Sequence, residues 1–177
     1  MLTVSHEPVG TGTVTHATIA SKLGDLTVVA RDGAVLGLYF PGHWYRPHPT
    51  SFGQCSEIGF DALRDQIGEY LDGGRRGFGV PVITNGNEYQ ERTWSLVRQV
   101  AYGETVTYGD IAAQLGDGST PQDVGAALGR NPVCLLVPCH RVVCAGGNLT
   151  GYAGGLARKR LLLELEAEVV GRPTRLF

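Results

Sequence analysis

The sequence predicts an α/β N-terminal domain, with a small antiparallel sheet and a helix, followed by a mainly α C-terminal domain that contains a helix-turn-helix. Short apolar segments separated by Asp-Gly turns fill the first part of the chain. Helical spacing of apolar residues and helix-capping residues prevail in the second part. The tract Arg75–Gly79 and the turn Asn85-Gly86 mark the boundary between them. We therefore expect domains at residues 1–84 and 85–177.

Three segments near the N-terminus have the composition of short strands: Val14–Ala20, Leu26–Ala30 and Val35–Phe40. They are apolar and rich in residues that favour strands. Gly24-Asp25 and Asp32-Gly33 separate them, and Asp-Gly between apolar runs is typical of a hairpin turn. We expect these segments to form an antiparallel sheet.

One helix is expected to follow the sheet. Apolar residues recur at helical spacing from Ile58 to Leu71, and Gly73-Gly74 ends the pattern. The preceding tract Pro41–Gly53 holds three prolines, which predicts a loop. Segment Val80–Ile83 is interpreted as one further strand.

Helix-capping residues organise the C-terminal half. Asn87, Thr107 and Thr120 each precede an apolar pattern of helical spacing, and Pro121 occupies the first helical position after Thr120. The third helix is expected to run to about Arg130. Two short helices joined by a glycine-containing turn indicate a helix-turn-helix, although such pairs also occur in proteins that bind no DNA.

The composition limits the class of protein. The chain has 177 residues, with 15 Lys and Arg against 17 Asp and Glu, for a formal net charge of −2. This balance argues against tight, nonspecific, charge-driven adhesion to DNA, but it permits local basic contacts. There is no long apolar run typical of a membrane span, and Met1–Gly10 has no secretory pattern. We therefore expect a cytoplasmic protein with reduced thiols and no membrane contact.

Segment 131–143 carries the clearest chemical signal. An apolar run ends at Pro138, and the pair Cys139-His140 follows. A thiol beside a buried run is ordinarily inert, but a neighbouring histidine or a helix N-terminus favours the thiolate. Because sequence neighbours in an extended chain point in opposite directions, a thiol–imidazole bond needs a turn or an intervening water. Glu164 and Glu166 are candidate acids for orienting the imidazole.

Other interpretations of these residues exist. A free cysteine is most often a small buried core residue. Cys134, Cys139 and Cys144 together with His140 could hold a metal, but they lack a close Cys-x-x-Cys pair, which disfavours zinc. A Cys-His hydrolase also remains open, because cysteine hydrolases share no general local signature.

Segment Pro138–Val143 resembles the active-site motif of the O6-alkylguanine-DNA alkyltransferases. Further motifs of that family follow the same order along the chain, closely over about residues 89–166 and loosely before them. These motifs are Tyr102–Ala112, Val124–Ala127, Asn131-Pro132, Gly151–Leu156 and the helix Arg158–Glu166. Because several motifs match in order, the resemblance is highly specific.

The resemblance implies a mechanism for direct reversal of DNA damage. Cys139 would accept the alkyl group from O6-alkylguanine, with O4-alkylthymine a second candidate substrate, in one irreversible turnover. His140 would act as a base through a water, and Glu166 would orient it. Asn131 would brace the turns of the site. Tyr108 would contact the flipped base and help to protonate the departing guanine.

The resemblance also implies partners and contacts. The partner would be alkylated double-stranded DNA, bound through its minor groove with the damaged base flipped out, and the protein would act as a monomer. No cofactor is expected, because the damaged base supplies the alkyl group, and no metal is expected, because cysteines near the N-terminus are lacking. Contacts to the base or the DNA are implied for six residues: Gln122, Val142, Tyr152, Ala153, Arg130 and Arg141.

The sequence departs from the family at the recognition helix. Gln122 stands where the family usually has an arginine that inserts into the base stack, and Asp123 beside it would repel phosphates. Residues 88–166 hold seven basic and eight acidic residues, so no surplus of positive charge compensates. A helix start at Thr120 explains Asp123 but does not replace the arginine. The alternative is the same cysteine chemistry on a non-duplex or small-molecule substrate. A module that binds alkylated DNA without transfer is disfavoured, because Cys139 is present.

Overall fold

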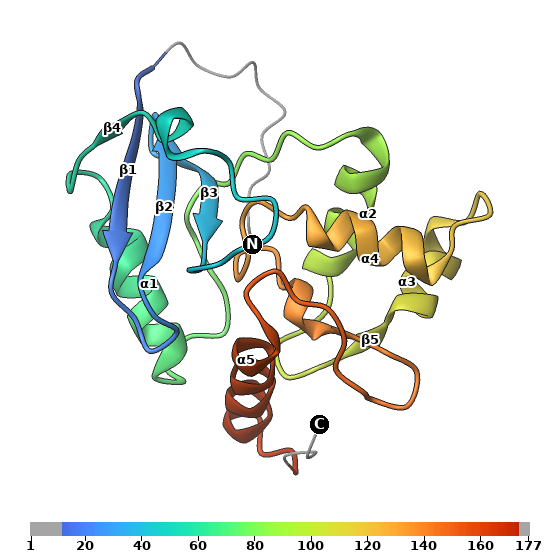
Figure 1. Cartoon of the computed structure of the whole chain (residues 1–177). Helices are drawn as coiled ribbons and strands as arrows, with labels where there is room; N and C mark the ends of the chain where they lie inside the picture. Colours follow the sequence, from blue (N-terminus) through green and yellow to red (C-terminus); the bar gives the residue numbers. More distant parts are fainter. Residues whose placement is uncertain (1–11, 174–177) are drawn as a thin grey trace. The chain divides into compact units, whose positions relative to one another are not determined.

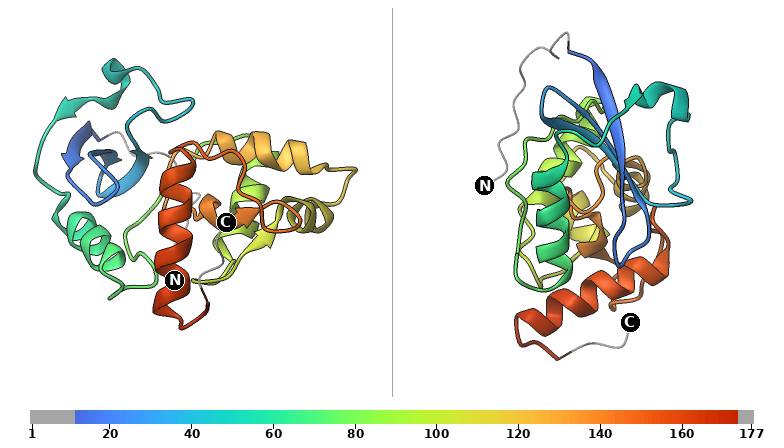
Figure 2. Two further views of the ribbon diagram at one scale, coloured as in Figure 1. Left: turned by 60° about the horizontal axis from the view of Figure 1, so that its bottom comes forward. Right: turned by 90° about the vertical axis from the view of Figure 1, so that its left-hand side faces the viewer.

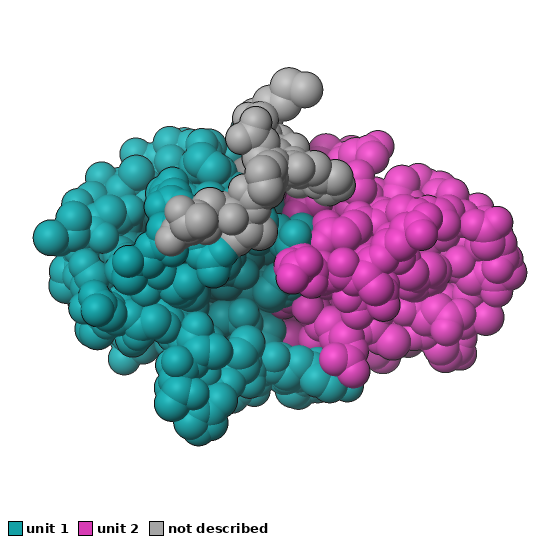
Figure 3. Space-filling view, turned by 90° about the horizontal axis from the view of Figure 1, so that it is seen from above, with its two compact units in different colours: residues 1–84, 132–136 teal, residues 85–131, 137–177 magenta. Residues whose placement is uncertain are grey.

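The computed structural model describes residues 12–173. The segment Met1–Gly10, on which the absence of a secretory pattern was judged, lies outside them. Two compact units make up the chain, one of residues 1–84 with 132–136 and the other of residues 85–131 with 137–177 (Figure 3). Residues 132–136, which we expected in the second domain, therefore pack with the first unit.

The first unit is built on a four-stranded sheet of order β3-β2-β1-β4 (Figure 1). β1 (Val14–Ile19), β2 (Leu26–Arg31) and β3 (Ala34–Tyr39) pair antiparallel, as predicted. β4 (Gln54–Cys55) joins β1 in parallel and was not predicted. It is only two residues long and exposed, so it carries no alternation of apolar and polar residues.

Helix α1 (Asp61–Leu71) lies alongside one face of this sheet (Figure 2) and buries Leu63, Ile67, Tyr70 and Leu71. It begins three residues later than expected. Ile58 is 85% exposed and its N–H donates to Ser56 Oγ in a turn, so it belongs to the loop before the helix.

The expected strand Val80–Ile83 is wrong. Only one isolated bridge forms there, between Val82 and Val35, with hydrogen bonds from Val35 N to Pro81 O and from Ile83 N to Val35 O. Proline lacks the N–H that a strand needs for a continuous ladder, so pairing does not extend.

Residues 132–136 add to the edge of β3. Leu38 N donates to Pro132 O at 2.8 Å, and Leu38 forms a parallel bridge with Val133. Val133 and the three residues after it are buried. The chain is therefore fixed within the first unit three residues before Cys139.

The second unit is mainly helical, as predicted. Asn87, Thr107 and Thr120 all cap helices, and in each case the side chains complete a reciprocal capping box. Trp94 packs in the core and donates from Nε1 to Ala127 O at 3.0 Å. The elements are α2 (Glu88–Arg98), β5 (Val106–Thr107), α3 (Tyr108–Leu115), α4 (Pro121–Gly129), η2 (Cys139–Arg141), β6 (Val142–Val143) and α5 (Leu156–Val169).

Helices α3 and α4 are joined by a short turn in which Ser119 N donates to Gly116 O, and both pack on α2. This is the expected helix-turn-helix. β5 and β6 form a parallel pair that joins the start of α3 to the chain just after η2. No helix among residues 12–173 is long and apolar enough to cross a bilayer.

Candidate active site

Cys139 begins a tight turn, η2, at the end of the buried apolar run. Its N–H donates to Val137 O at 2.8 Å, and Arg141 N donates to Pro138 O at 2.9 Å. This 3₁₀ geometry ends the extended chain, so Cys139 and His140 do not follow the alternating directions of a strand. Both side chains are buried, Cys139 with 4% of its surface exposed.

Asn131 braces this turn from the end of α4. Its side chain is fully buried, and Nδ2 donates to Val137 O at 3.0 Å and to Cys139 Sγ at 3.1 Å. A hydrogen bond to the charged form of a group favours that form. The contact from Asn131 therefore stabilises the thiolate of Cys139 and fixes the direction of its side chain.

Glu166 holds His140 from helix α5. His140 Nε2 lies 2.8 Å from Glu166 Oε1, and both side chains are fully buried. Because an ionised carboxylate can only accept hydrogen bonds, the proton of the neutral imidazole is assigned to Nε2. The lone pair is then on Nδ1, which is the ring nitrogen able to accept a proton.

Burial and charge set the ionisation of this pair. Burial lowers the pKa of His140 below its ordinary value, although Glu166 opposes this effect, so the imidazole is neutral at neutral pH. Burial also opposes ionisation of Glu166, but the contacts with His140 and Arg141 outweigh it and hold the pKa of that carboxyl well below its usual range. The site thus pairs a neutral base with an anion.

Arg141 belongs to the same buried network. Its Nε lies 2.9 Å from Glu166 Oε2, its Nη2 donates to Glu166 Oε1 at 3.0 Å, and its Nη1 donates to Val100 O at 2.8 Å. Gly103 N adds a further donor to Glu166 Oε2 at 2.9 Å. Arg141 was expected to contact DNA. It is instead buried, and its guanidinium holds the acid that orients His140.

A small cavity of about 20 Å³ reaches Cys139. That volume suits one water molecule or one group of methyl size. Tyr108, Tyr152 and Ala153, three residues implied by the resemblance, meet Cys139 there. The complete lining is Tyr108, Gly125, Leu128, Gly129, Cys139, Gly151, Tyr152 and Ala153.

A groove of about 500 Å³ adjoins this cavity, and Tyr108, Gly125 and Gly151 line both. The start of α4, with Pro121 and Gln122, forms part of its wall, and Cys144 and Thr150 form another part. Two expected contact residues, Val142 and Arg130, line neither the groove nor the cavity.

Asp123 has a local structural role. Its Oδ2 accepts hydrogen bonds from Thr120 N at 3.0 Å and from Thr120 Oγ1 at 2.6 Å, and these bonds lower the pKa of the carboxyl. Gln122 beside it is exposed. The helix start therefore explains the acid at this position, and Gln122 is free to reach a ligand in the groove.

Sequence reasoning missed Lys159. It is fully buried on α5, and its Nζ donates to Val142 O at 2.7 Å, to Thr150 O at 3.1 Å and to Tyr108 Oη at 3.4 Å. It stands between Arg158 and Arg160, and the sequence analysis gave it no role. Its burial could have been predicted from its helical spacing to Leu162, Leu163 and Glu166, which are all buried on the same helix.

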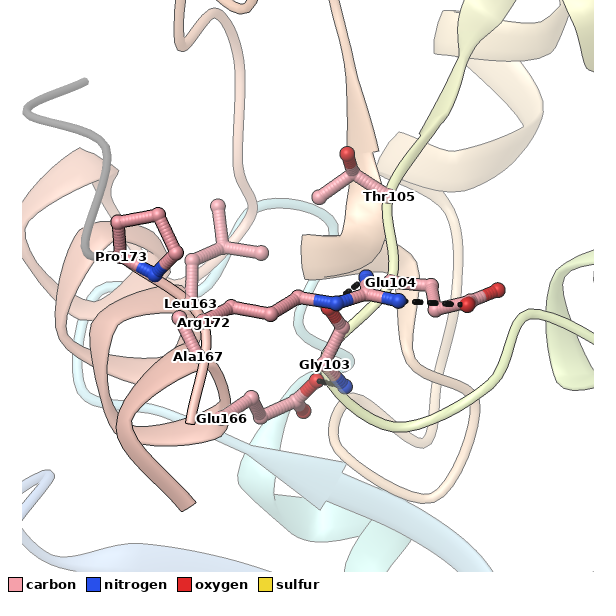
Figure 4. A pocket seen from close by; sticks show the side chains of 8 residues that line it. All are labelled: Gly103, Glu104, Thr105, Leu163, Glu166, Ala167, Arg172 and Pro173. Atoms are coloured by element: carbon pink, nitrogen blue, oxygen red, sulfur yellow. Dashed lines mark hydrogen bonds and ion pairs between the residues drawn. The ribbon is translucent and has the colours of Figure 1, made fainter. Parts of the chain in front are cut away.

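A second cavity, of about 510 Å³, is lined in part by Glu166 and does not include Cys139 (Figure 4). Arg172 crosses it, donating to Gly103 O at 2.8 Å and to Glu104 Oε1 at 2.9 Å. Among residues 12–173, no group of three or more His, Cys, Asp or Glu side chains is placed to hold a metal ion.

Comparison with known proteins agrees with this geometry. Residues 88–168 match the family model of the 6-O-methylguanine DNA methyltransferase DNA-binding domain. The methylated-DNA–protein-cysteine methyltransferase of Mycolicibacterium paratuberculosis is 39% identical over 153 residues, which are 86% of this chain and 92% of the relative. An inducible protein of the same name from Bacillus subtilis is 46% identical over 101 residues, covering 57% of this chain and 56% of the relative.

A crystal structure of Mycobacterium tuberculosis OGT in complex with DNA has 38% identity and a TM-score of 0.83, and covers 88% of this chain and 94% of that one. The fold and the cysteine site together define a DNA-repair transferase that acts through a cysteine. The chain belongs to the methylated-DNA–protein-cysteine methyltransferase family. The resemblance found in the sequence is thereby confirmed.

Proposed function

We propose that this protein repairs O6-alkylguanine in DNA by moving the alkyl group irreversibly to Cys139 Sγ. One observation carries the proposal. Cys139 lines a cavity of methyl size, Asn131 donates to its sulfur, and His140, paired with Glu166 of α5, follows it on the same turn. A thiolate, a base and an orienting acid are the parts that such an alkyl transfer needs.

The reaction begins with loss of the thiol proton. His140 Nδ1 accepts it through one bridging water. Glu166 stabilises the imidazolium that forms, because its carboxylate already accepts from Nε2. Asn131 Nδ2 stabilises the thiolate.

The thiolate then displaces guanine at the alkyl carbon. The S–C bond forms as the C–O6 bond breaks, and the electron pair leaves with the base. Tyr108, which lines the cavity, donates its hydroxyl proton to the departing guanine. Because a thioether has no easy route to hydrolysis, each molecule reacts once.

The reacting base must leave the duplex to reach Cys139, at a cost of a few kcal/mol. The groove between α4 and residues 144–151 receives it, with Gln122 at the edge nearest the helix start. We place α4 in the minor groove and the protein on DNA as a monomer, in the compartment that holds the cell's DNA. O4-alkylthymine is a second substrate with the same displacement chemistry.

Analysis of the DNA product tests the proposal. A duplex oligonucleotide with one O6-methylguanine, in excess, is incubated with increasing amounts of protein, digested to nucleosides and analysed by chromatography. We expect guanine in place of O6-methylguanine, in proportion to protein added and never beyond one equivalent. Cys139→Ser should abolish the conversion, and Cys55→Ser, at an exposed cysteine that lines neither the groove nor the cavity, should retain it. Persistence of O6-methylguanine with folded wild-type protein would contradict the proposal, as would conversion by Cys139→Ser.

A small-molecule substrate is the alternative. The similarity over most of the chain to relatives named for methylated DNA favours DNA instead. Reaction with free O6-benzylguanine but with no duplex would reverse this preference.

A further inference from the structure

The turn Ala101–Glu104 contacts both members of the buried pair Arg141 and Glu166. A hydrogen bond of 3.1 Å joins the last residue of the turn to its first, and Gly103 has a φ of +77°, a conformation that glycine adopts without strain. Gly103 N donates to Glu166 Oε2 at 2.9 Å. The centroid of the Tyr102 ring lies 5.6 Å from Arg141 Cζ. The position of this turn therefore affects the acid and its guanidinium partner.

The Gly103 N–H reaches the Glu166 carboxylate from a different segment than the other donors. Oε1 accepts from His140 Nε2 at 2.8 Å and from Arg141 Nη2 at 3.0 Å, and Oε2 accepts from Arg141 Nε at 2.9 Å. These donors belong to neighbouring residues of η2, whereas Gly103 precedes β5. Loss of the Gly103 contact would leave the carboxylate more freedom to turn relative to η2, and with it the hydrogen bond to His140.

The chain after α5 folds back onto the same turn. Gly171 has a φ of +68°, and the N–H groups of Gly171 and Arg172 donate to carbonyl oxygens in the last turn of the helix, in the pattern of a Schellman motif. The Arg172 side chain then donates from Nη1 to Gly103 O at 2.8 Å and from Nη2 to Glu104 Oε1 at 2.9 Å (Figure 4). Arg172 lines the second cavity and not the cavity at Cys139.

Gly103 is thus held at both of its peptide groups. Its N–H donates to Glu166, and its carbonyl accepts from Arg172. A Cβ at this position would lie 2.6 Å from Val170 Cγ2, so the turn packs closely against the end of α5. Because the two peptide groups share one Cα, a contact that fixes the carbonyl also limits the movement of the N–H.

We propose that Arg172 is a positioning residue for the orienting acid, and that by holding Gly103 O it keeps the Gly103 N–H on Glu166 and the carboxylate aligned with His140. This inference rests on the proposed alkyl transfer, in which Glu166 orients His140. The Arg172 side chain is 54% exposed, so its ion pair with Glu104 contributes little to stability. The contact with Gly103 therefore carries the role.

The proton between His140 and Glu166 is a direct reporter of this alignment. A charge-assisted hydrogen bond is short and strong, and the proton in such a bond resonates far downfield. The protein is labelled with ¹⁵N-histidine, and the Nε2–H signal of His140 is assigned by its absence from His140→Asn. Arg172→Met should move this signal upfield and speed its exchange with water. Arg172→Lys should restore it in part, because an ammonium can still donate to Gly103 O.

Two control variants separate the contact with Gly103 from surface charge. Glu104→Gln removes the charge of the ion pair but leaves Arg172 to donate to Gly103 O. Arg160→Met removes a cation from an exposed position of α5. Both should leave the His140 signal unchanged and keep transfer from an O6-methylguanine duplex within about twofold of the wild-type rate.

Single-turnover transfer gives the kinetic consequence. Arg172→Met should slow transfer from the same duplex by roughly three- to tenfold, as expected for the weakening of one hydrogen bond in the network. In the Glu166→Gln background the same substitution should have little further effect, because the carboxylate through which it acts is gone.

An unchanged His140 signal in Arg172→Met, even with a lower melting temperature, would assign Arg172 a purely structural role and overturn the inference. An equal loss in Glu104→Gln, or an undiminished loss of rate in the Glu166→Gln background, would also overturn it. The spectra are recorded without DNA. Failure of the wild type to transfer an alkyl group would therefore refute the proposed function separately, whatever the spectra show about Arg172.

Discussion

The replacement Glu166→Gln tests the buried network that holds His140. The carboxylate accepts hydrogen bonds from His140, from Arg141 and from Gly103 N. The distance from each donor nitrogen to the nearest carboxylate oxygen is between 2.8 and 3.0 Å. A glutamine keeps the shape of the side chain but replaces one oxygen with an NH₂ group. This NH₂ group would face N–H donors and could accept no hydrogen bond from them. It also leaves the Arg141 guanidinium buried without its counter-charge.

The magnitude follows from that loss. Breaking a buried ion pair on one side typically costs about 3–5 kcal/mol. For a chain of this size each kcal/mol corresponds to roughly 2–4 °C, so we expect the melting temperature to fall by about 6–20 °C. Transfer should fall by at least about a hundredfold in the protein that remains folded, because the imidazole loses the acceptor that sets its tautomer.

The assay is calorimetry together with single-turnover transfer to Cys139, measured below the melting temperature of the variant. Glu164→Gln is the matched control, a partly buried acid on the same helix that makes no contact in the network, and it should change the melting temperature by about 1–2 °C at most. A melting temperature and a transfer rate of Glu166→Gln close to those of the wild type would refute the reasoning.

Three further predictions follow from the same geometry. The free energy of unfolding should fall as the pH drops below about 6.5, because burial lowers the pKa of His140 in the folded state and the unfolded chain then binds more protons. The lowered pKa of Glu166 extends this loss to lower pH. Urea titrations at pH 5 and pH 7 measure the change, and equal free energies of unfolding at the two pH values would contradict the prediction. Gly125→Ala should slow transfer of a benzyl group more than transfer of a methyl group, because the added Cβ would take up space in the groove, 3.9 Å from Tyr108 Cε1 and without a clash. Equal effects on the two substrates would contradict the assignment of the groove as the binding site. Gln122→Arg should speed the reaction with duplex O6-methylguanine by about tenfold and leave the rate with free O6-benzylguanine unchanged, because a cation at this exposed position gains a phosphate contact. Competition kinetics measure both rates, and an equal gain with both substrates would contradict a phosphate contact.

Local signals in the sequence predicted much of the fold. The helices that begin after Asn87, Thr107 and Thr120 were found because each cap is made by residues within three positions of one another. The strands β1 to β3 followed from short apolar runs divided by turns. The start of α1 was misplaced, because Ile58 continues the helical spacing although it is exposed in the structure.

Features that depend on distant partners could not be predicted. Segment 132–136 pairs with β3, almost a hundred residues earlier, and no local pattern records that contact. The family resemblance implied a DNA contact for Arg141, whose buried partner Glu166 lies 25 residues later in the sequence, and Lys159 was overlooked between two arginines.

The site itself came from the resemblance to a family. Composition and spacing alone left Cys139 and His140 open to a core, metal or hydrolase interpretation. The order of several motifs removed that ambiguity, and it also supplied Asn131 and Tyr108. The structure then placed all four beside one cavity or in direct contact with the residues that line it.

The most direct test of the account is the mass of the protein after incubation with a duplex that contains one O6-methylguanine, followed by peptide mapping. We predict a gain of one methyl group, located on Cys139 and absent from Cys134, Cys144 and Cys55. No gain in mass, with the protein folded and Cys139 shown to be reduced, would contradict the central claim, and so would a methyl group on any other residue.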